Sequence, residues 1–310
     1  MNRDFTFETY GELLDAGLES EYEFLTVREY LATDNEELPG QFVILRHDVD
    51  RKPENALAMA RLEAARGVPS TYYVRTIDKT FRPGLIRRIE ELGHEVGYHY
   101  EDMDRADGDV AAAHESFSAE LARMRALVSV DTVCMHGNPL TAHDNRDMWD
   151  AGGGDSEAAA AGAATDGGGL TGKAKAAGGD AGTTESKSGT TSGVVASDEH
   201  GGTPTFDTYG LLGEAYLSMD FEDVTYFSDT GRTWRDGALK IKDHTMGEGD
   251  KRIQVDTTEE LAALLRSDEV DRLCALTHPN RWARTPGEWA IESAKDYAIN
   301  VAKRGINVVA

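Results

Sequence analysis

Apolar and polar positions recur along the chain with two different periods, which predicts strands and helices in turn. Short apolar runs rich in β-branched and aromatic residues predict strands at 42–45, 70–74, 93–98, 133–135, 224–227 and 273–277. Apolar residues three and four positions apart predict helices over 53–66, 83–92 and 108–128, and two more that begin near Asp256 and Thr285. The alternation indicates an α/β fold with a mainly parallel sheet, either open or closed into a barrel.

The segment 151–203 breaks this pattern. It is rich in glycine, alanine and small polar residues and contains no aromatic residue. Such a composition buries too little apolar surface to offset the entropy cost of ordering. We therefore predict a flexible, low-complexity insertion within a single domain that spans 1–310, because strand-and-histidine units occur on both sides of it.

The composition is strongly acidic. Aspartate and glutamate number 56 against 32 lysines and arginines, which gives a formal net charge of −24, and 40% of the residues are apolar. Acids are spread through most of the predicted helices, as expected for a surface that stays hydrated in very salty cytoplasm, so we expect a halophilic origin. A specific cationic partner is the alternative. The charge argues against nucleic acid as a partner, since that requires a basic face.

Location and redox state follow from what the sequence lacks. No apolar run approaches the ~18 residues needed to span a bilayer, and the first residues do not form a signal peptide, so a cytoplasmic protein is expected. Cys134 and Cys274 both lie in apolar, strand-like runs. Buried, inert thiols are the expectation, because nothing points to an oxidising compartment and two cysteines are too few for a thiolate zinc site.

Histidines and acids follow the predicted strands. His47, His99, His136 and His278 come at or just after apolar runs, and the carboxyl ends of parallel strands meet on one face of the fold. Asp48 and Asp50, two residues apart in an extended segment, project to the same side, where a bound cation would relieve their repulsion. The alternative is a solvated Asx turn in which Asp50 caps a helix. For His94 we expect structural packing.

Five landmarks in order resemble the polysaccharide deacetylase (NodB-homology) family, especially its divergent branch with an Arg-His-Asp-Val-Asp motif. They span Phe42 to Trp282, interrupted by the insertion, and are Leu45–Asp50, Gly93–Glu101, Met135–Pro139, Tyr226–Trp234 and Leu276–Pro279. The resemblance implies a distorted (β/α)7-type barrel that binds one divalent metal ion and removes N-acetyl groups from amino sugars. Zinc is the expected ion, with cobalt or manganese as alternatives.

The resemblance also implies residue roles. Asp48 matches the catalytic base, Asp50 and His99 match metal ligands, and His278 matches the general acid that protonates the departing amine. The second metal histidine of the family should stand at position 103, which is Met103, and a thioether is a poor ligand for such an ion. Glu101, Asp102 or His136 would then supply the third ligand, and we favour His136; a degraded site is the alternative.

Further residues of the landmarks are candidate substrate contacts. The third landmark lacks the family's usual arginine, whose charge Arg146 could replace, and aromatic rings could stack on a sugar or simply pack in the core. The predicted substrate-binding residues are Arg46, Tyr98, Glu101, Asn138, Arg146 and Trp234. The expected function is a metal-dependent deacetylase of an amino-sugar glycan or its nucleotide- or lipid-linked precursor. The alternatives are a non-catalytic glycan-binding descendant of that fold, or a hydrolase of another non-peptide C–N bond.

Overall fold

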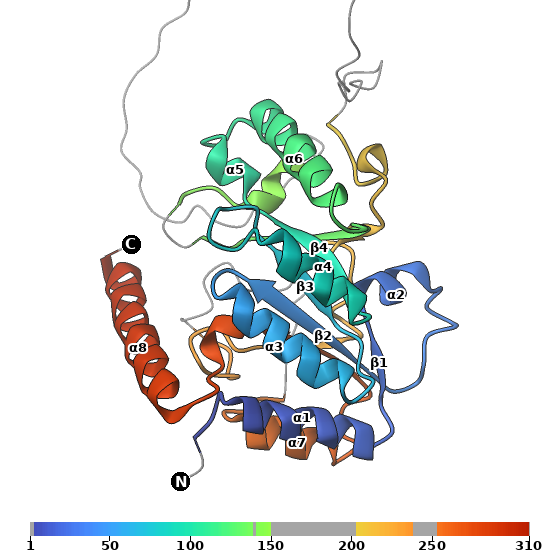
Figure 1. Ribbon diagram of the computed structural model, residues 1–310, viewed down its shortest axis with the longest axis vertical. Helices are drawn as coiled ribbons and strands as arrows, with labels where there is room; N and C mark the ends of the chain where they lie inside the picture. Colours follow the sequence, from blue (N-terminus) through green and yellow to red (C-terminus); the bar gives the residue numbers. More distant parts are fainter. Residues whose placement is uncertain (1–2, 139–140, 150–202, 238–252, 310) are drawn as a thin grey trace, which may run out of the picture.

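A parallel β-sheet covered by helices forms the body of the computed structural model, which describes residues 3–138, 141–149, 203–237 and 253–309 (Figure 1). The predicted insertion at 151–203 lies outside the described residues, except for its last position, and so does Pro139 of the third landmark.

All strand pairs of the sheet are parallel, so their carboxyl ends meet at one edge. The order is β6-β5-β4-β3-β2-β8-β7. The short strand β1 pairs with the first half of β2, and β3 pairs with the second half of the same strand. The strands are β1 (Glu23–Leu25), β2 (Phe42–Val49), β3 (Thr71–Val74), β4 (Glu95–Tyr100), β5 (Thr132–Met135), β6 (Gly213–Glu214), β7 (Thr225–Ser228) and β8 (Arg272–Thr277).

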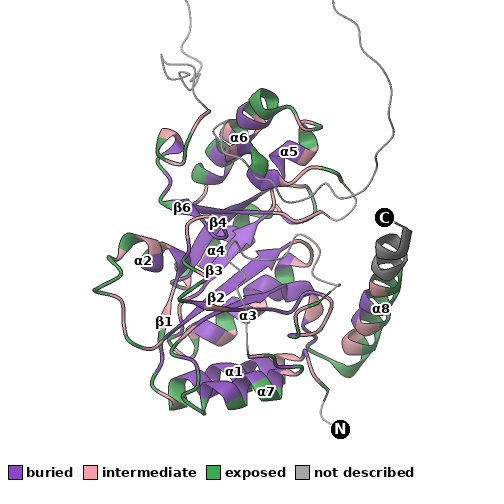
Figure 2. Ribbon diagram, turned by 180° about the vertical axis from the view of Figure 1, so that it is seen from behind, coloured by how far each residue is buried: buried purple, intermediate pink, exposed green. Residues whose placement is uncertain are grey.

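Most helices connect strands and cover the outer face of the sheet, where the burial colours show their inward sides packed away from solvent (Figure 2). The last helix follows the last strand and lies to one side of the sheet (Figure 1). The α-helices are α1 (Phe7–Glu19), α2 (Val27–Ala32), α3 (Pro53–Ala64), α4 (Pro83–Glu91), α5 (Asp102–Arg105), α6 (Val110–Arg125), α7 (Thr258–Leu265) and α8 (Pro286–Val309). The 3-10 turns are η1 (Asn145–Trp149), η2 (Asp207–Tyr209) and η3 (Pro279–Arg281).

The predicted strands and helices are confirmed within a few residues. The start of α7 differs by one position: Thr257, rather than Asp256, is the N-cap, and its hydroxyl accepts from the amide of Glu260. The hydrophobic pattern did not predict α1, β1, α2 or the two-residue β6. Short strands carry too few positions for a period, and α2 owes its start to a capping box between Thr26 and Glu29.

The sheet curls into a half-barrel. Among the described strands, β6 and β7 are the two ends of the order and do not pair with each other. Their ends nevertheless approach, because the hydroxyl of Tyr216, just after β6, lies 3.3 Å from that of Tyr226 in β7. The structure thus confirms an α/β fold with a parallel, barrel-like sheet.

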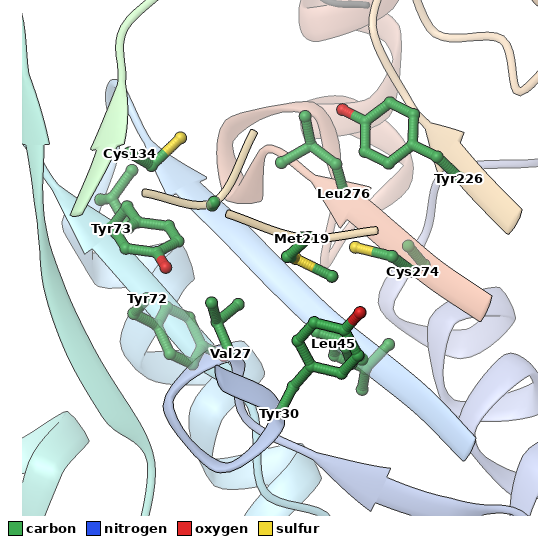
Figure 3. Close-up of a cluster of buried hydrophobic side chains, with 14 of the residues drawn as sticks. Val27, Tyr30, Leu45, Tyr72, Tyr73, Cys134, Met219, Tyr226, Cys274 and Leu276 are labelled. Atoms are coloured by element: carbon green, nitrogen blue, oxygen red, sulfur yellow. The ribbon is translucent and has the colours of Figure 1, made fainter. Parts of the chain in front are cut away.

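Close packing lines the concave face. Gly97 lies opposite Tyr73 on the neighbouring strand, and a Cβ at position 97 would come within 2.3 Å of the Tyr73 ring. Tyr73, Cys134 and Leu276, from three different strands, belong to this core (Figure 3). Both cysteines are free and buried, as predicted.

Candidate metal centre

The two-residue period of β2 divides the Arg-His-Asp-Val-Asp motif between the two faces of the sheet. Arg46 and Asp48 lie on the concave face, and Asp50 follows directly after the strand. His47 points the other way, toward α3, where it meets Glu63 at 2.8 Å. The concave side of the motif thus receives its arginine and both aspartates.

Asp50, His99 and His136 converge at the carboxyl ends of β2, β4 and β5. The Oδ1 atom of Asp50 lies 3.1 Å from Nδ1 of His136 and 3.4 Å from Nε2 of His99. The two imidazole nitrogens are 3.3 Å apart. Three potential ligand atoms therefore form a nearly equilateral triangle.

This triangle has the dimensions of a tetrahedral metal site. Zinc bonds to nitrogen and carboxylate oxygen of about 2.0–2.1 Å, at tetrahedral angles, place ligand atoms about 3.3–3.4 Å apart. Asp50 Oδ1 is buried and forms no well-oriented hydrogen bond, although both nitrogens are close. A buried carboxylate oxygen without a donor is costly unless a cation satisfies it. The residues present therefore fit a divalent ion.

The surrounding charges keep Asp50 ionised, which is the form that binds a cation. Burial by itself would raise the pKa of Asp50, but His136 and His99 bring it well below its ordinary value. Burial would lower the pKa of His99, but Asp48 and Asp50 raise it above its ordinary value. His99 also points its Nδ1 at the carbonyl of Cys134, at 3.0 Å, which leaves Nε2 for the triangle.

A second group, Asp48, His99 and Cys134, is also close enough to hold an ion. Both groups contain His99, so the two groups are alternative sites for one ion. Asp48 is already held by an arginine, and Cys134 does not line the cavity described below. We therefore assign the candidate centre to Asp50, His99 and His136.

Met103 is not a ligand. Its side chain is buried in the hydrophobic core. Of the alternatives, Glu101 pairs with Arg75 and Arg105, and Asp102 accepts hydrogen bonds from Tyr98 and Ser116. The structure thus brings His136, and neither of these acids, to Asp50 and His99.

Asp48 lies beside the triangle and is held by Arg46. The guanidinium donates to both carboxylate oxygens, from Nε at 3.1 Å and from Nη2 at 2.8 Å. The ring of Tyr216 lies against Arg46, 4.1 Å from its central carbon. Arg46 is fully buried. Arg46, a predicted substrate contact, is not among the residues that line the cavity and instead holds Asp48, whose Oδ2 lies 3.7 Å from Nε2 of His99.

His278 faces the same centre from the end of β8. Its Nε2 lies 3.9 Å from Oδ2 of Asp50. Its Nδ1 lies 2.7 Å from Oδ1 of Asp229, and its backbone amide donates to Oδ2 of the same carboxylate. Because a carboxylate only accepts, Nδ1 carries the proton and Nε2 is left toward Asp50.

Asp229 is itself fixed by four donors. Arg281 and the indole of Trp282 each donate to it at 2.9 Å, in addition to the two groups of His278. Burial by itself would raise the pKa of Asp229, but His278 and Arg281 hold it below the ordinary value. An ionised, immobile carboxylate therefore orients the imidazole.

A cavity of about 240 Å³ opens on this centre. Asp48, Asp50, His99, His136 and His278 all line it. The rest of its polar wall consists of Arg51, Arg75, Thr230, Arg281, Asp296 and Asn300, the last two from α8. The two predicted catalytic residues and the three predicted ligands thus share one cavity.

The other predicted substrate contacts do not line it. Tyr98 and Trp234 are fully buried and pack in the core, where their polar atoms bond to Asp102 and Thr258 respectively. Glu101 is occupied by two arginines, as described above. Arg146 pairs with Asp144 at 2.7 Å. Asn138 is half-buried and follows Gly137, which does line the cavity.

Three residues in or directly behind the cavity wall were not predicted from the sequence: Asp229, Arg75 and Asp296. Asp229 stands in the fourth landmark directly after β7, the same signal that singled out Asp48 and His278. Arg75 directly follows β3 and could have been found in that way too. Asp296 lies in α8, far along the chain, and no local pattern marks it.

A second buried cluster lies on the outer face, around Glu63 of α3. One carboxylate oxygen accepts from Tyr10 and lies 2.8 Å from Nε2 of His47; the other accepts from Ser70 and Tyr72, both at 2.7 Å. His94 lies 2.9 Å from the Ser70 hydroxyl and 2.8 Å from the carbonyl of Ala60. The expected packing role of His94 agrees with these contacts.

Comparison with family models, with curated proteins and with solved structures found no match. The likeness to the deacetylase family therefore rests on the landmarks alone. None of the helices in the described ranges combines the length and the apolar character that crossing a membrane requires.

Proposed function

We propose that this chain is a metal-dependent hydrolase that removes N-acetyl groups from an amino-sugar-containing glycan or its precursor. The observation that carries the proposal is the arrangement around one cavity: the Asp50–His99–His136 triangle, with Asp48 on one side and His278 on the other. Asp229 supports His278 from behind. Hydrolysis of an amide needs a group that takes a proton from water and one that protonates the departing nitrogen.

The two proton-transfer roles are divided by position. Asp48, held by Arg46, is the base that takes a proton from the attacking water. As general acid, His278 starts as the imidazolium, which Asp229 stabilises, and gives the proton on Nε2 to the departing amine. Asp50, His99 and His136 would hold a divalent cation, which would supply Lewis-acid chemistry when bound. The size of the cavity favours a single sugar unit over a long chain segment, since it is smaller than the ~300–1,000 Å³ typical of drug-sized ligands.

Metal binding tests the centre without reference to activity. The full-length chain is stripped with a chelator and titrated with Co²⁺, whose visible absorption reports tetrahedral coordination, and with Zn²⁺. We expect about one ion per chain, lost in Asp50→Asn and retained in His143→Ala, a control histidine outside the cavity. Binding that survives Asp50→Asn would refute the assigned ligands.

Acetate release tests the reaction. The zinc-, cobalt- and manganese-loaded protein is incubated with N-acetylated sugars, their phosphates and oligosaccharides, with cyclic amides as a separate arm. We expect acetate from an amino sugar, with kcat lowered at least ~100-fold by Asp48→Asn and by His278→Ala. A loaded protein that binds sugar but releases no acetate would be the non-catalytic alternative. Turnover of the cyclic amides alone would indicate another C–N hydrolase.

A further inference from the structure

Three arginines stand at the carboxyl ends of three neighbouring strands and line the cavity. Arg75 follows β3, Arg51 follows β2 by two residues, and Arg281 lies in η3 after β8. The strands are adjacent in the order β3-β2-β8. A cationic arc therefore borders the candidate centre, in a chain whose formal net charge is −24.

Unsatisfied donors mark this arc. Among the described residues, Arg51 forms no hydrogen bond or ion pair, although it is only half-exposed. Arg75 binds Glu101 through an Nη atom, and Arg281 binds Asp229 in the same way. In both arginines the Nε–H is buried and has no hydrogen-bond partner. A buried, charged donor without a hydrogen bond costs free energy, and a bound ligand that accepts from it removes that cost.

The carboxylates of the cavity offset only part of the charge of these three arginines. Asp48 is held by Arg46, which stands outside the cavity lining, and Asp50 belongs to the metal triangle. Asp296 is shared among several arginines: it lies 3.9 Å from Arg232 and also faces Arg281 and Arg51. With a divalent ion in place, the cavity carries excess positive charge beside Arg51.

We propose that the acetamido sugar carries an oxyanion, either a phosphate or a carboxylate, and that Arg51 binds it, assisted by the free Nε–H groups of Arg75 and Arg281. This inference rests on the proposed function and narrows its substrate class. Guanidinium groups bind oxyanions through paired, charge-assisted hydrogen bonds. A neutral glycan would leave these donors unmet.

Binding is measured by calorimetry on the zinc-loaded Asp48→Asn protein, which prevents turnover. The probes are N-acetylglucosamine, its 1-phosphate and the corresponding uronic acid. We expect the phosphate, the carboxylate or both to bind at least ~10-fold more tightly than the neutral sugar, and Arg51→Gln to remove most of this advantage. Arg51→Lys should keep part of it, and Arg87→Gln, at an exposed site on α4, should keep all of it.

The binding and acetate-release measurements together separate this inference from the proposed function. An equal affinity for all three probes, or an advantage that survives Arg51→Gln, overturns the anion site even if acetate is released. In the latter case the oxyanion would contact the metal ion directly. An Arg51-dependent advantage without acetate release from any sugar would support the anion site while the proposed deacetylation fails. The source of the anion follows from whether the phosphate or the uronate binds more tightly.

Discussion

The substitution Glu63→Gln tests whether the buried cluster behind the motif supports the fold. The carboxylate of Glu63 accepts from two donors at each oxygen: Tyr10 and His47 at one, Ser70 and Tyr72 at the other. A glutamine keeps a single acceptor oxygen and turns an NH₂ group toward the second pair of donors. At least two hydrogen bonds to a charged acceptor are lost, each worth about 1.5–3 kcal/mol.

We therefore expect Glu63→Gln to lower the free energy of unfolding by about 3–5 kcal/mol. Rotation of the tyrosine and serine hydroxyls keeps the loss toward the lower value. The matched control is Glu54→Gln, an exposed position in the first turn of the same helix, for which a loss of at most about 1 kcal/mol is expected from the helix dipole. Equilibrium unfolding in urea measures both, with an unchanged denaturant slope as the condition for comparison.

Acid sharpens the same test. Burial by itself would raise the pKa of Glu63, but His47, His94 and the hydrogen bonds lower it to about 2. A carboxyl whose pKa is depressed on folding stabilises the native state above its unfolded value of ~4.3, and that contribution, about 3 kcal/mol, is lost as the pH falls toward 2. The Glu63→Gln protein should not show this loss of unfolding free energy between about pH 4.5 and about pH 2. Equal stability losses in Glu63→Gln and Glu54→Gln at neutral pH would refute the reasoning.

The remaining predictions concern the candidate site and the surface. His136→Ala should weaken zinc binding at least ~100-fold, whereas Met103→Leu should leave it unchanged, as measured by competition with a chelator. Asp229→Asn should lower kcat for acetate release ~10- to 100-fold at unchanged zinc content, because His278 loses its orientation. Arg46→Met should cost about 3–5 kcal/mol of unfolding free energy by leaving Asp48 buried and unpaired. The unfolding temperature should rise from ~0.1 to ~1 M salt as the −24 charge is screened.

The sequence predicted the elements that carry a clear period and the residues that follow them. The strands at 42–45 and 273–277 and the helix at 83–92 have long apolar patterns, and the structure places them where expected. The roles given to Asp50, His99 and His136 came from the resemblance to the deacetylase family. That the three lie together follows from the parallel strands, whose carboxyl ends meet whatever their separation in sequence. That rule needs no knowledge of side-chain contacts.

Contacts between distant segments were beyond the same reasoning. Tyr98 and Trp234 resemble sugar-stacking residues in the sequence, but alternation along β4 turns Tyr98 to the outer face, and Phe5 and Trp282 enclose Trp234. Arg46 could equally have faced a substrate or an acid of its own strand. Only the position of Asp48, two residues along the same face, decides that question.

Strand β2 connects the two polar centres of the molecule. Its inward residues, Arg46 and Asp48, serve the cavity, and its outward His47 bonds to Glu63 and to Thr277 of β8. A one-residue shift of β2 would exchange these faces, placing His47 in the cavity and a buried arginine among apolar helix side chains. The Glu63 cluster therefore does more than stabilise α3: by holding His47 outward, it fixes the register that presents Asp48 and Asp50 to the metal centre.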